Sequence, residues 1–190
     1  MASKKSRPRR IKKPSVSSSP AVLFRPERKV YVRGERRAGG CVFCQALKRG
    51  PSAESLLLHV TAHAMIIMNK YPYNSGHLLV LPRRHSGDFL QITSEEHVDI
   101  SRCQTLAVCA LSDAYQPAGF NMGLNLGAAS GAGIPEHLHF HVIPRWAGDT
   151  NFFPLIARSK VVIETLEQTY EKLRAYFTKA DAKARKGARK

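Results

Sequence analysis

The segment PEHLHFHVIPRW, residues 135–146, places a histidine at every second position. Side chains alternate between the two faces of a β-strand, so this spacing predicts that His137, His139 and His141 project from one face, about 7 Å apart along the strand. The imidazoles would then face a cleft, and the apolar side chains between them would face the hydrophobic core. Those apolar side chains belong to Leu138, Phe140 and Val142.

Three chemical interpretations of this histidine row are open. The simplest is a solvated strand face that carries histidines without a function. A pure metal site is the second, but no carboxylate ligand follows the row, and Glu136 would point to the opposite face. Nucleophilic catalysis is the third, because a neutral imidazole is a good nucleophile near pH 7 and can attack phosphorus and hold a nucleotidyl group.

The formal charge of +16 is concentrated at the two ends of the chain. Residues 1–37 hold 13 Lys and Arg against 2 Asp and Glu, residues 179–190 hold 6 against 1, and residues 38–178 hold 11 of each sign. Residues 1–37 contain too few large apolar side chains to offset their ordering entropy, so we expect a disordered basic tail there. A catalytic domain over 38–178 and a basic C-terminal tail over 179–190 would follow. The tails could bind nucleic acid weakly, although a solvated tail is the simpler interpretation.

The cysteines bear on the cellular compartment. The chain has no run of about 18 apolar residues that could span a membrane, and its first residues lack the apolar core of a secretory signal. We therefore expect a cytoplasmic protein with reduced cysteines. Cys103 and Cys109 lie in an apolar, helix-like run and are expected to be buried thiols. Cys41 and Cys44 could be a redox pair, half of a zinc site or a coincidence.

Hydrophobic periodicity divides the central region into strands and helices. Residues 56–69 and 77–82 resemble strands, and the connector KYPYNSG between them favours a hairpin. Thr93 followed by Glu96 fits a capping box at the start of a helix that ends near Tyr115.

The second half of the chain repeats this order of strand and helix. A strand is expected over 120–127, followed by the glycine-rich loop AASGAGIPE, the histidine strand and a last helix from about Val161 to Thr178. Strands and helices in this order imply an α+β domain built on an antiparallel sheet.

The heptapeptide HLHFHVI fits the pattern His-φ-His-φ-His-φ-φ, where φ is hydrophobic, and so resembles the signature of the histidine triad superfamily. Further marks occur in the family's order: FC near the start, an asparagine in MNKYPYNSGHLLVLP, and a glycine-rich loop before the histidines. The resemblance covers about residues 38–178 and implies a sheet of about five strands with two main helices. The extension PRWAGDTNF, residues 144–152, is similar to that of bacterial diadenosine tetraphosphate phosphorylase-type members.

The resemblance also implies roles for individual residues. His139 would be the nucleophile that takes the nucleotidyl group, His141 would bond a phosphate oxygen, and His137 would orient the nucleophile. The loop GAASGAG would hold phosphates through backbone N–H groups, since glycine permits a close approach. The implied nucleotide-binding residues are Asn69 for the ribose, Asn125, Ser130 and Gly131 for the phosphates, and Val42 and Phe43 for the base.

A structural zinc ion is implied in the same way. Several bacterial triad proteins, and the related galactose-1-phosphate uridylyltransferases, bind zinc through a cysteine pair, a downstream histidine and the first triad histidine. The matching ligands here are Cys41, Cys44, His85 and His137, and no organic cofactor is implied.

The remaining histidines and arginines have no such context. We expect His59, His63 and His97 to be surface or strand residues, and His77 to be as readily structural as functional. The arginines are expected to form solvated ion pairs; they are Arg83, Arg84 and Arg145.

The implied activity is cleavage of dinucleoside polyphosphates, such as diadenosine tetraphosphate, through a nucleotidyl-His139 intermediate. The acceptor would be inorganic phosphate in a phosphorylase or water in a hydrolase, and the sequence does not choose between them. The alternatives are a nucleoside phosphoramidase, an enzyme that processes adenylated nucleic-acid ends with the basic tail as an arm, and a nucleotide-binding sensor. Family members usually dimerise by joining their sheets, so we expect a homodimer.

Overall fold

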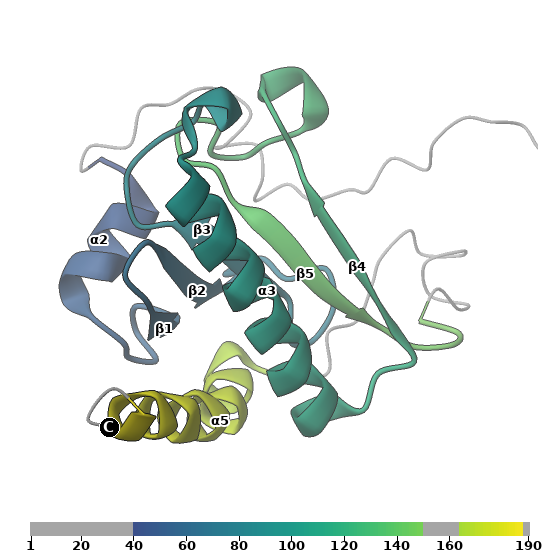
Figure 1. The fold of residues 1–190 in the computed structure, drawn as a ribbon. Coiled ribbons are helices and arrows are strands. Elements are labelled where there is room, and N and C mark those ends of the chain that lie inside the picture. Colours follow the sequence, from purple (N-terminus) through teal and green to yellow (C-terminus); the bar gives the residue numbers. More distant parts are fainter. Residues whose placement is uncertain (1–39, 150–163, 188–190) are drawn as a thin grey trace, which may run out of the picture.

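A five-stranded antiparallel sheet is the centre of the fold (Figure 1). The computed structural model describes residues 40–149 and 164–187. In it the strands pair in the order β1-β2-β3-β5-β4, and helices pack on the sheet. The α+β class with about five antiparallel strands is therefore confirmed. The elements are α2 (Val42–Arg49), β1 (Leu57–Val60), β2 (Ala64–Met68), β3 (Leu78–Pro82), α3 (Ser94–Tyr115), β4 (Gly119–Leu124), β5 (Phe140–Arg145) and α5 (Leu166–Gly187).

Helices cover both faces of the sheet, which explains why β2 is buried along its whole length. Ala64 and Ile66 belong to the larger core, to which α3 and α5 contribute, and α3 runs across this face in Figure 1. Met65 and Ile67 belong to a second core, to which α2 contributes Phe43. Because side chains alternate across a strand, α2 lies on the opposite face from α3 and α5.

The histidine segment divides its side chains as its alternation predicts. Leu138 and Val142 are buried in the larger core, and Phe140 packs against it. The difference lies in the backbone, because β5 begins only at Phe140. His137 and His139 precede the strand, in a segment that the Leu138 N–H anchors by donating to the Ser86 carbonyl over 2.8 Å.

The helix α3 begins with the expected capping box. The Thr93 hydroxyl accepts a hydrogen bond from the Glu96 N–H over 3.3 Å, and the Glu96 carboxylate accepts one from the Thr93 N–H over 3.0 Å. Each side chain satisfies a backbone donor that the first helical turn leaves without an intrahelical partner.

Residues 56–69 form two strands instead of the one expected. The chain turns at residues 61–63, and β1 pairs with β2 as a hairpin. The turn is stabilised by Asp99 of α3, whose carboxylate accepts hydrogen bonds from the Thr61 hydroxyl over 2.6 Å and the His63 N–H over 2.8 Å. Because Asp99 is distant in the sequence, its contact with the turn leaves no pattern in residues 56–69 that could predict the turn.

The helix boundaries also differ from those expected. The short helix α2 was not expected, whereas α5 begins at Leu166 and continues to Gly187, past the expected end at Thr178. Thr165 and Gln168 exchange hydrogen bonds at its start as a second capping box. Ala, Lys and Arg after Thr178 are among the best helix formers, which explains the extension.

Several expectations concern segments outside the described residues. These are the proposed tail over 1–37, residues 150–152 of the extension, the start of the last helix at Val161, and the end of the C-terminal tail over 188–190. No helix within the described residues is long and apolar enough to cross a membrane.

The expectation of two buried thiols in α3 is wrong for one of them. Cys103 is buried, but Cys109 is exposed. Six residues of helix correspond to a rotation of about 600°, so the two side chains leave the helix in different directions.

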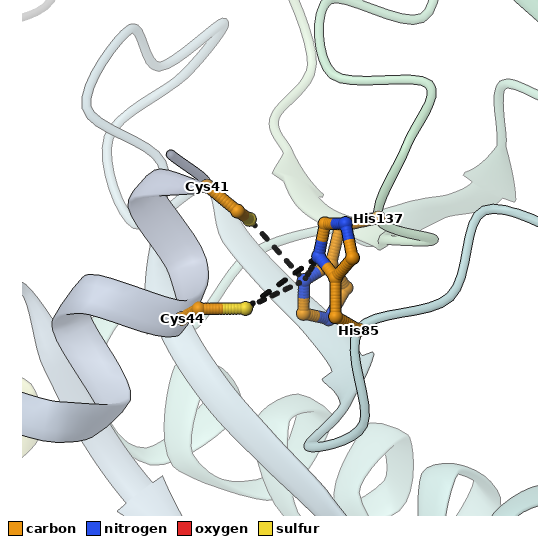
Figure 2. Close-up of side chains that lie close together, drawn as sticks. All are labelled: Cys41, Cys44, His85 and His137. Atoms are coloured by element: carbon orange, nitrogen blue, oxygen red, sulfur yellow. Dashed lines mark hydrogen bonds between the residues drawn. The ribbon is translucent and has the colours of Figure 1, made fainter. Parts of the chain in front are cut away.

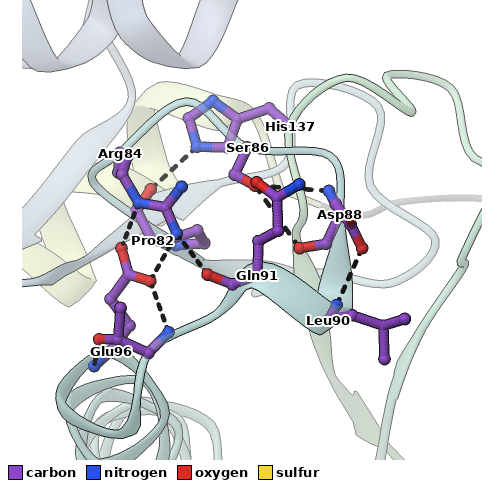
Figure 3. A network of polar contacts seen from close by, with 9 residues as sticks. Pro82, Arg84, Ser86, Asp88, Leu90, Gln91, Glu96 and His137 are labelled. Atoms are coloured by element: carbon purple, nitrogen blue, oxygen red, sulfur yellow. Dashed lines mark hydrogen bonds and ion pairs between the residues drawn. The ribbon is translucent and has the colours of Figure 1, made fainter.

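The segment between β3 and α3 is held by a network of polar contacts (Figure 3). Arg84 donates two hydrogen bonds of 2.9 Å to the Glu96 carboxylate and one of 2.8 Å to the Gln91 carbonyl. Asp88 accepts a hydrogen bond from the Leu90 N–H over 2.9 Å. The network fixes His85, which lies next to Arg84 in the chain.

Gly87 allows this segment to pack directly on the backbone that precedes His137. A Cβ atom at Gly87 would lie 2.4 Å from the Pro135 carbonyl oxygen and 3.0 Å from the Glu136 Cα. Both atoms belong to the backbone and cannot rotate away.

We expect the change Gly87→Ala to lower the free energy of unfolding by about 1–3 kcal/mol, because it over-packs this backbone contact. The matched control is Gly119→Ala, where an added Cβ meets nothing within 4 Å. Urea unfolding followed by circular dichroism measures both. Equal stability of the two variants would show that the contact between the two segments is not tight.

Candidate active site

A cavity of about 630 Å³ lies on the α2 side of the sheet, and His139 and His141 are part of its wall. One face of α2 lines it with Val42, Phe43 and Ala46. The end of β2, the connector to β3 and the glycine-rich loop complete the wall. Of the residues expected to bind nucleotide, the cavity brings together Val42, Phe43, Asn69, Asn125 and Gly131.

Ser130 is the expected nucleotide-binding residue that lies outside this lining. Its side chain is exposed, and its hydroxyl donates to the Gly127 carbonyl over 2.7 Å. Gly127 and Gly131 both have positive φ values, 78° and 88°, which glycine adopts without strain. The hydroxyl thus stabilises the turn of the loop, and Gly131 faces the cavity.

His139 is buried, and its tautomer follows from its hydrogen bond. Its Nδ1 lies 2.8 Å from the His137 carbonyl oxygen, which can only accept, so Nδ1 carries the proton. In the neutral ring the lone pair is therefore on Nε2. Burial lowers the pKa of His139 below its usual value, and the hydrogen bond to the carbonyl opposes this shift. The ring is thus neutral near pH 7, the form that can act as a nucleophile.

His141 is linked to His77 in a chain of hydrogen bonds. The Tyr73 N–H donates to His77 Nδ1 over 3.1 Å, so the His77 proton is on Nε2. His77 Nε2 donates in turn to His141 Nδ1 over 2.8 Å. In neutral His141 the proton is therefore on Nε2, and the ring can act as a hydrogen-bond donor within the cavity wall.

Asn69 supports the assignment of the His77 proton to Nε2. Its Oδ1 accepts a hydrogen bond from the Tyr71 N–H over 2.9 Å, which fixes the orientation of the amide. The Nδ2 group then points at the His77 ring, 3.3 Å from Nδ1. Asn69 thus lines the cavity and braces His77 at the same time.

His77 is a site residue that the sequence left undecided between a structural and a functional role. It is 2% exposed, and it stands two residues before Leu79, the residue paired with His141. Residues two apart share a strand face, so the β3–β5 register brings the two rings together. That register is a property of the folded sheet and could not be read from the sequence.

Four potential metal ligands converge beside the histidine segment (Figure 2). Their ligand atoms all lie within 4.8 Å of one another, so the group could hold a metal ion. The residues are Cys41, Cys44, His85 and His137. His137 Nδ1 lies 3.4 Å from Cys41 Sγ, 3.7 Å from Cys44 Sγ and 3.3 Å from His85 Nδ1, and Cys44 Sγ lies 3.5 Å from His85 Nδ1.

The chemistry of the four residues fits a tetrahedral metal site. Bonds of about 2.0–2.3 Å, as in tetrahedral zinc sites, place ligand atoms roughly 3.3–3.8 Å apart, the range of the four separations just given. His137 Nε2 donates to the Pro82 carbonyl over 2.9 Å, so its lone pair is on Nδ1, toward the two sulfurs. Burial, opposed by this bond and assisted by the charges of His85 and His139, lowers the pKa of His137 to about 4.

The metal cluster and the cavity share the helix α2. Cys41 caps the helix and Cys44 lies in its first turn, while Phe43 between them lies beneath the histidine segment. The Phe43 ring centroid is 5.5 Å from that of His137 and 5.4 Å from that of His139. Burial, with the neighbouring Cys41 sulfur, raises the pKa of the Cys44 thiol. A bound metal ion would fix α2, and with it one wall of the cavity.

The other charged and histidine candidates have structural contacts. Arg145 pairs with Asp149, and Arg83 donates to the carbonyls of Thr61 and Ala62. The ion pair of Arg84 with Glu96 belongs to the network before α3. Among the histidines, His59 is buried in β1 against Phe177, whereas His63 and His97 are exposed.

The model of the HIT domain family matches residues 51–148, which is more than half of the chain. An AP-4-A phosphorylase of Mycobacterium tuberculosis is 42% identical over 103 residues, 54% of this chain and 53% of that protein. The chain therefore spans about half the length of this relative. An adenosine 5'-monophosphoramidase of Schizosaccharomyces pombe is 28% identical over 105 residues, 55% of this chain and 74% of that protein.

The fold also resembles solved structures. A Zn-bound histidine triad family protein from Mycobacterium smegmatis superimposes with a TM-score of 0.59 over 75% of this chain and 96% of that one. Its sequence identity is 24%, so this likeness concerns the fold alone.

We expect Co²⁺ added to the metal-free protein to give the visible absorption of tetrahedral thiolate coordination, with about one ion per chain. Cys44→Ser removes one ligand and should abolish or strongly shift these bands. Cys109→Ser, which changes an exposed thiol outside the cluster, is the control and should leave them unchanged. An unaltered spectrum in Cys44→Ser would place the metal elsewhere.

Proposed function

The chain belongs to the HIT domain family, and on this basis we propose that it cleaves dinucleoside polyphosphates, with diadenosine tetraphosphate as the model substrate. The observation that carries the proposal is the arrangement of two histidines with complementary protonation in the wall of one cavity. His139 offers a lone pair on Nε2, and His141 offers an N–H on Nε2. A nucleophile beside a proton donor is what transfer of a phosphorus group requires.

The proposed first step forms a bond between His139 Nε2 and the phosphorus of one nucleotidyl group. The bond from that phosphorus to the bridging oxygen breaks, and the nucleoside polyphosphate departs with the electron pair. The neutral state of His139 needs no base to activate it, because burial and the His137 carbonyl hold the proton on the far nitrogen. In the second step an acceptor oxygen attacks phosphorus and the P–N bond breaks.

In the proposed reaction, hydrogen-bond donors with fixed positions stabilise the charge that develops on the phosphate. The bond to His77 sets the tautomer of His141, and the proposed role of its Nε2–H is to donate to a phosphate oxygen or to the departing oxygen. Gly131, with its positive φ, presents backbone to the cavity at the position expected for phosphate contacts. Donors that are already oriented lower the barrier because they need no reorganisation during the reaction.

The rest of the cavity fits a nucleoside. Val42, Phe43, Ala46, Leu56 and Ile67 give an apolar wall for a base, and Asn69 and Asn125 give polar groups between this wall and the histidines. We assign these side chains to base and ribose or phosphate contacts. The mixture of an apolar wall with a few polar groups is typical of small-molecule sites.

We assign zinc to the group of Cys41, Cys44, His85 and His137, with a structural role. Two sulfurs and two ring nitrogens are a donor set that zinc favours, and all four positions are filled by protein, which leaves none for substrate. When bound, the ion would supply rigidity by joining α2 to the loop after β3 and to the histidine segment. His137 would then position the main chain that carries His139.

Inorganic phosphate is the proposed acceptor, because the AP-4-A phosphorylase is 42% identical. The phosphoramidase at 28% identity supports a second candidate, cleavage of a nucleoside phosphoramidate at the same histidine. A cytoplasmic location and a homodimer joined at the edge strand β4 complete the proposal. The middle of β4, residues 121–123, is exposed in the described chain.

Incubation with diadenosine tetraphosphate and phosphate should yield ADP and ATP, because the adenylyl group leaves His139 on phosphate oxygen. Chromatography of the products measures this outcome. Without phosphate, AMP and ATP would appear slowly from attack by water. AMP and ATP at an undiminished rate in both mixtures would make the enzyme a hydrolase. No cleavage here, together with release of AMP from adenosine 5'-phosphoramidate, would favour the second candidate.

His139→Ala should reduce turnover by at least about 10³-fold, because it removes the attacking nitrogen. Nucleotide affinity should change much less, since the base wall and the glycine loop remain. Quenched-flow kinetics and calorimetric titration with AMP measure the two effects. The control His97→Ala changes an exposed histidine on α3 and should keep the wild-type rate. Turnover retained in His139→Ala would remove the assigned nucleophile.

A further inference from the structure

Asn74 links the connector between β2 and β3 to the far end of β5. It is 4% exposed, and its Nδ2 donates to the Pro144 carbonyl over 2.8 Å and to Asp149 Oδ2 over 3.1 Å. The main-chain carbonyl of Asn74 accepts a hydrogen bond from the His77 N–H over 3.1 Å. The residue therefore joins two segments that are distant in the sequence, the connector that leads to His77 and the end of β5.

Asp149, an acceptor of Asn74, is itself held by contacts with Arg145 and with the turn after β5. Its carboxylate accepts two hydrogen bonds from Arg145 of β5, one of them 2.7 Å long, and its side chain is 9% exposed. Its N–H donates to the Trp146 carbonyl over 3.1 Å, which closes a turn directly after β5. Arg145 also bonds Asn121 of β4. A buried carboxylate in an ion pair with a fixed strand residue is an acceptor whose position is well defined.

The link reaches the histidines through the neighbour of Asn74. The Tyr73 N–H is the backbone donor that keeps His77 Nδ1 without a proton, and it precedes Asn74 directly in the chain. If the connector moved, His77 could carry its proton on Nδ1. His77 Nε2 would then accept from His141 Nδ1, and neutral His141 would turn a lone pair on Nε2 toward the substrate in place of a donor.

We propose that Asn74 is a positioning residue that fixes the tautomer of the His77–His141 pair through its bonds to Pro144 and Asp149. An asparagine suits this place because its amide supplies two N–H donors to two acceptors. An aspartate of the same shape would bring three acceptors together with no donor. The effect on turnover rests on the proposed function, but the effect on the tautomer does not.

The test is a long-range ¹H–¹⁵N spectrum of the histidine rings, which distinguishes protonation at Nδ1 from protonation at Nε2. In the full-length, metal-loaded wild-type chain we expect His77 and His141 both to be protonated at Nε2. In Asn74→Asp and Asn74→Ala we expect a mixture of tautomers for both rings. Asn121→Ala, on the neighbouring strand β4, loses a bond to Arg145 and leaves the bonds of Asn74 in place, so it should retain the wild-type pattern.

The second readout is the kinetics on diadenosine tetraphosphate. We expect kcat to fall by about tenfold or more with KM little changed in both Asn74 variants, because the donor is lost mainly in the transition state. Asn74→Ser, with one donor, should be intermediate, and it replaces Asn74→Ala if that variant does not fold. Wild-type tautomers in the folded Asn74 variants would overturn the proposal. Altered tautomers in a protein that turns over no nucleotide would support it and refute the proposed function instead.

Discussion

Backbone groups decide which nitrogen of each key histidine carries the proton, and the chemistry of the site depends on this constraint. The carbonyl of Pro82 holds the proton of His137 on Nε2, and the carbonyl of His137 holds that of His139 on Nδ1. The N–H of Tyr73 has the opposite effect on His77, whose proton is directed to His141. Main-chain groups do not titrate, so each of them fixes the tautomer of the neutral ring that it contacts. Successive rings of one segment thereby acquire different capacities: a ligand, a nucleophile and a donor.

The metal cluster and the cavity depend on each other through α2. The helix has eight residues, which is too short to be stable alone in water. Its position comes from Phe43 and Ala46 in the smaller core and from the two cysteines that face His85 and His137. The same helix forms the apolar wall of the cavity. A metal ion at the cluster would therefore stabilise the wall of the cavity from outside it, which fits a closed set of four ligands beside His139 and His141.

The sequence predicted features that depend on local pattern and left open those that depend on pairing. The alternation in residues 137–142 identified the side chains that reach the core, and Thr93 with Glu96 identified the start of α3. The Cys-x-x-Cys spacing, together with the family resemblance, named four residues that the fold does bring together. The role of His77 could not be derived, because it requires the register of β3 against β5. The turn at residues 61–63 depends on Asp99 of α3, and the position of Ser130 outside the cavity depends on the shape of the glycine loop.

The two ends of β5 differ in their chemistry. At its start, the histidine segment is anchored by contacts to carbonyl groups, and burial lowers the pKa of His137 and His139. At its end, Arg145 and Asp149 form an ion pair, and the bond between them raises the pKa of Arg145. The proposed attack of His139 on phosphorus requires an uncharged ring, since a protonated imidazole cannot be a nucleophile. At the other end, the charged pair holds Asp149, which accepts a hydrogen bond from Asn74 of the connector to His77. The histidines thus lie before and at the start of β5, and the contacts that hold the connector to His77 lie at and after its end.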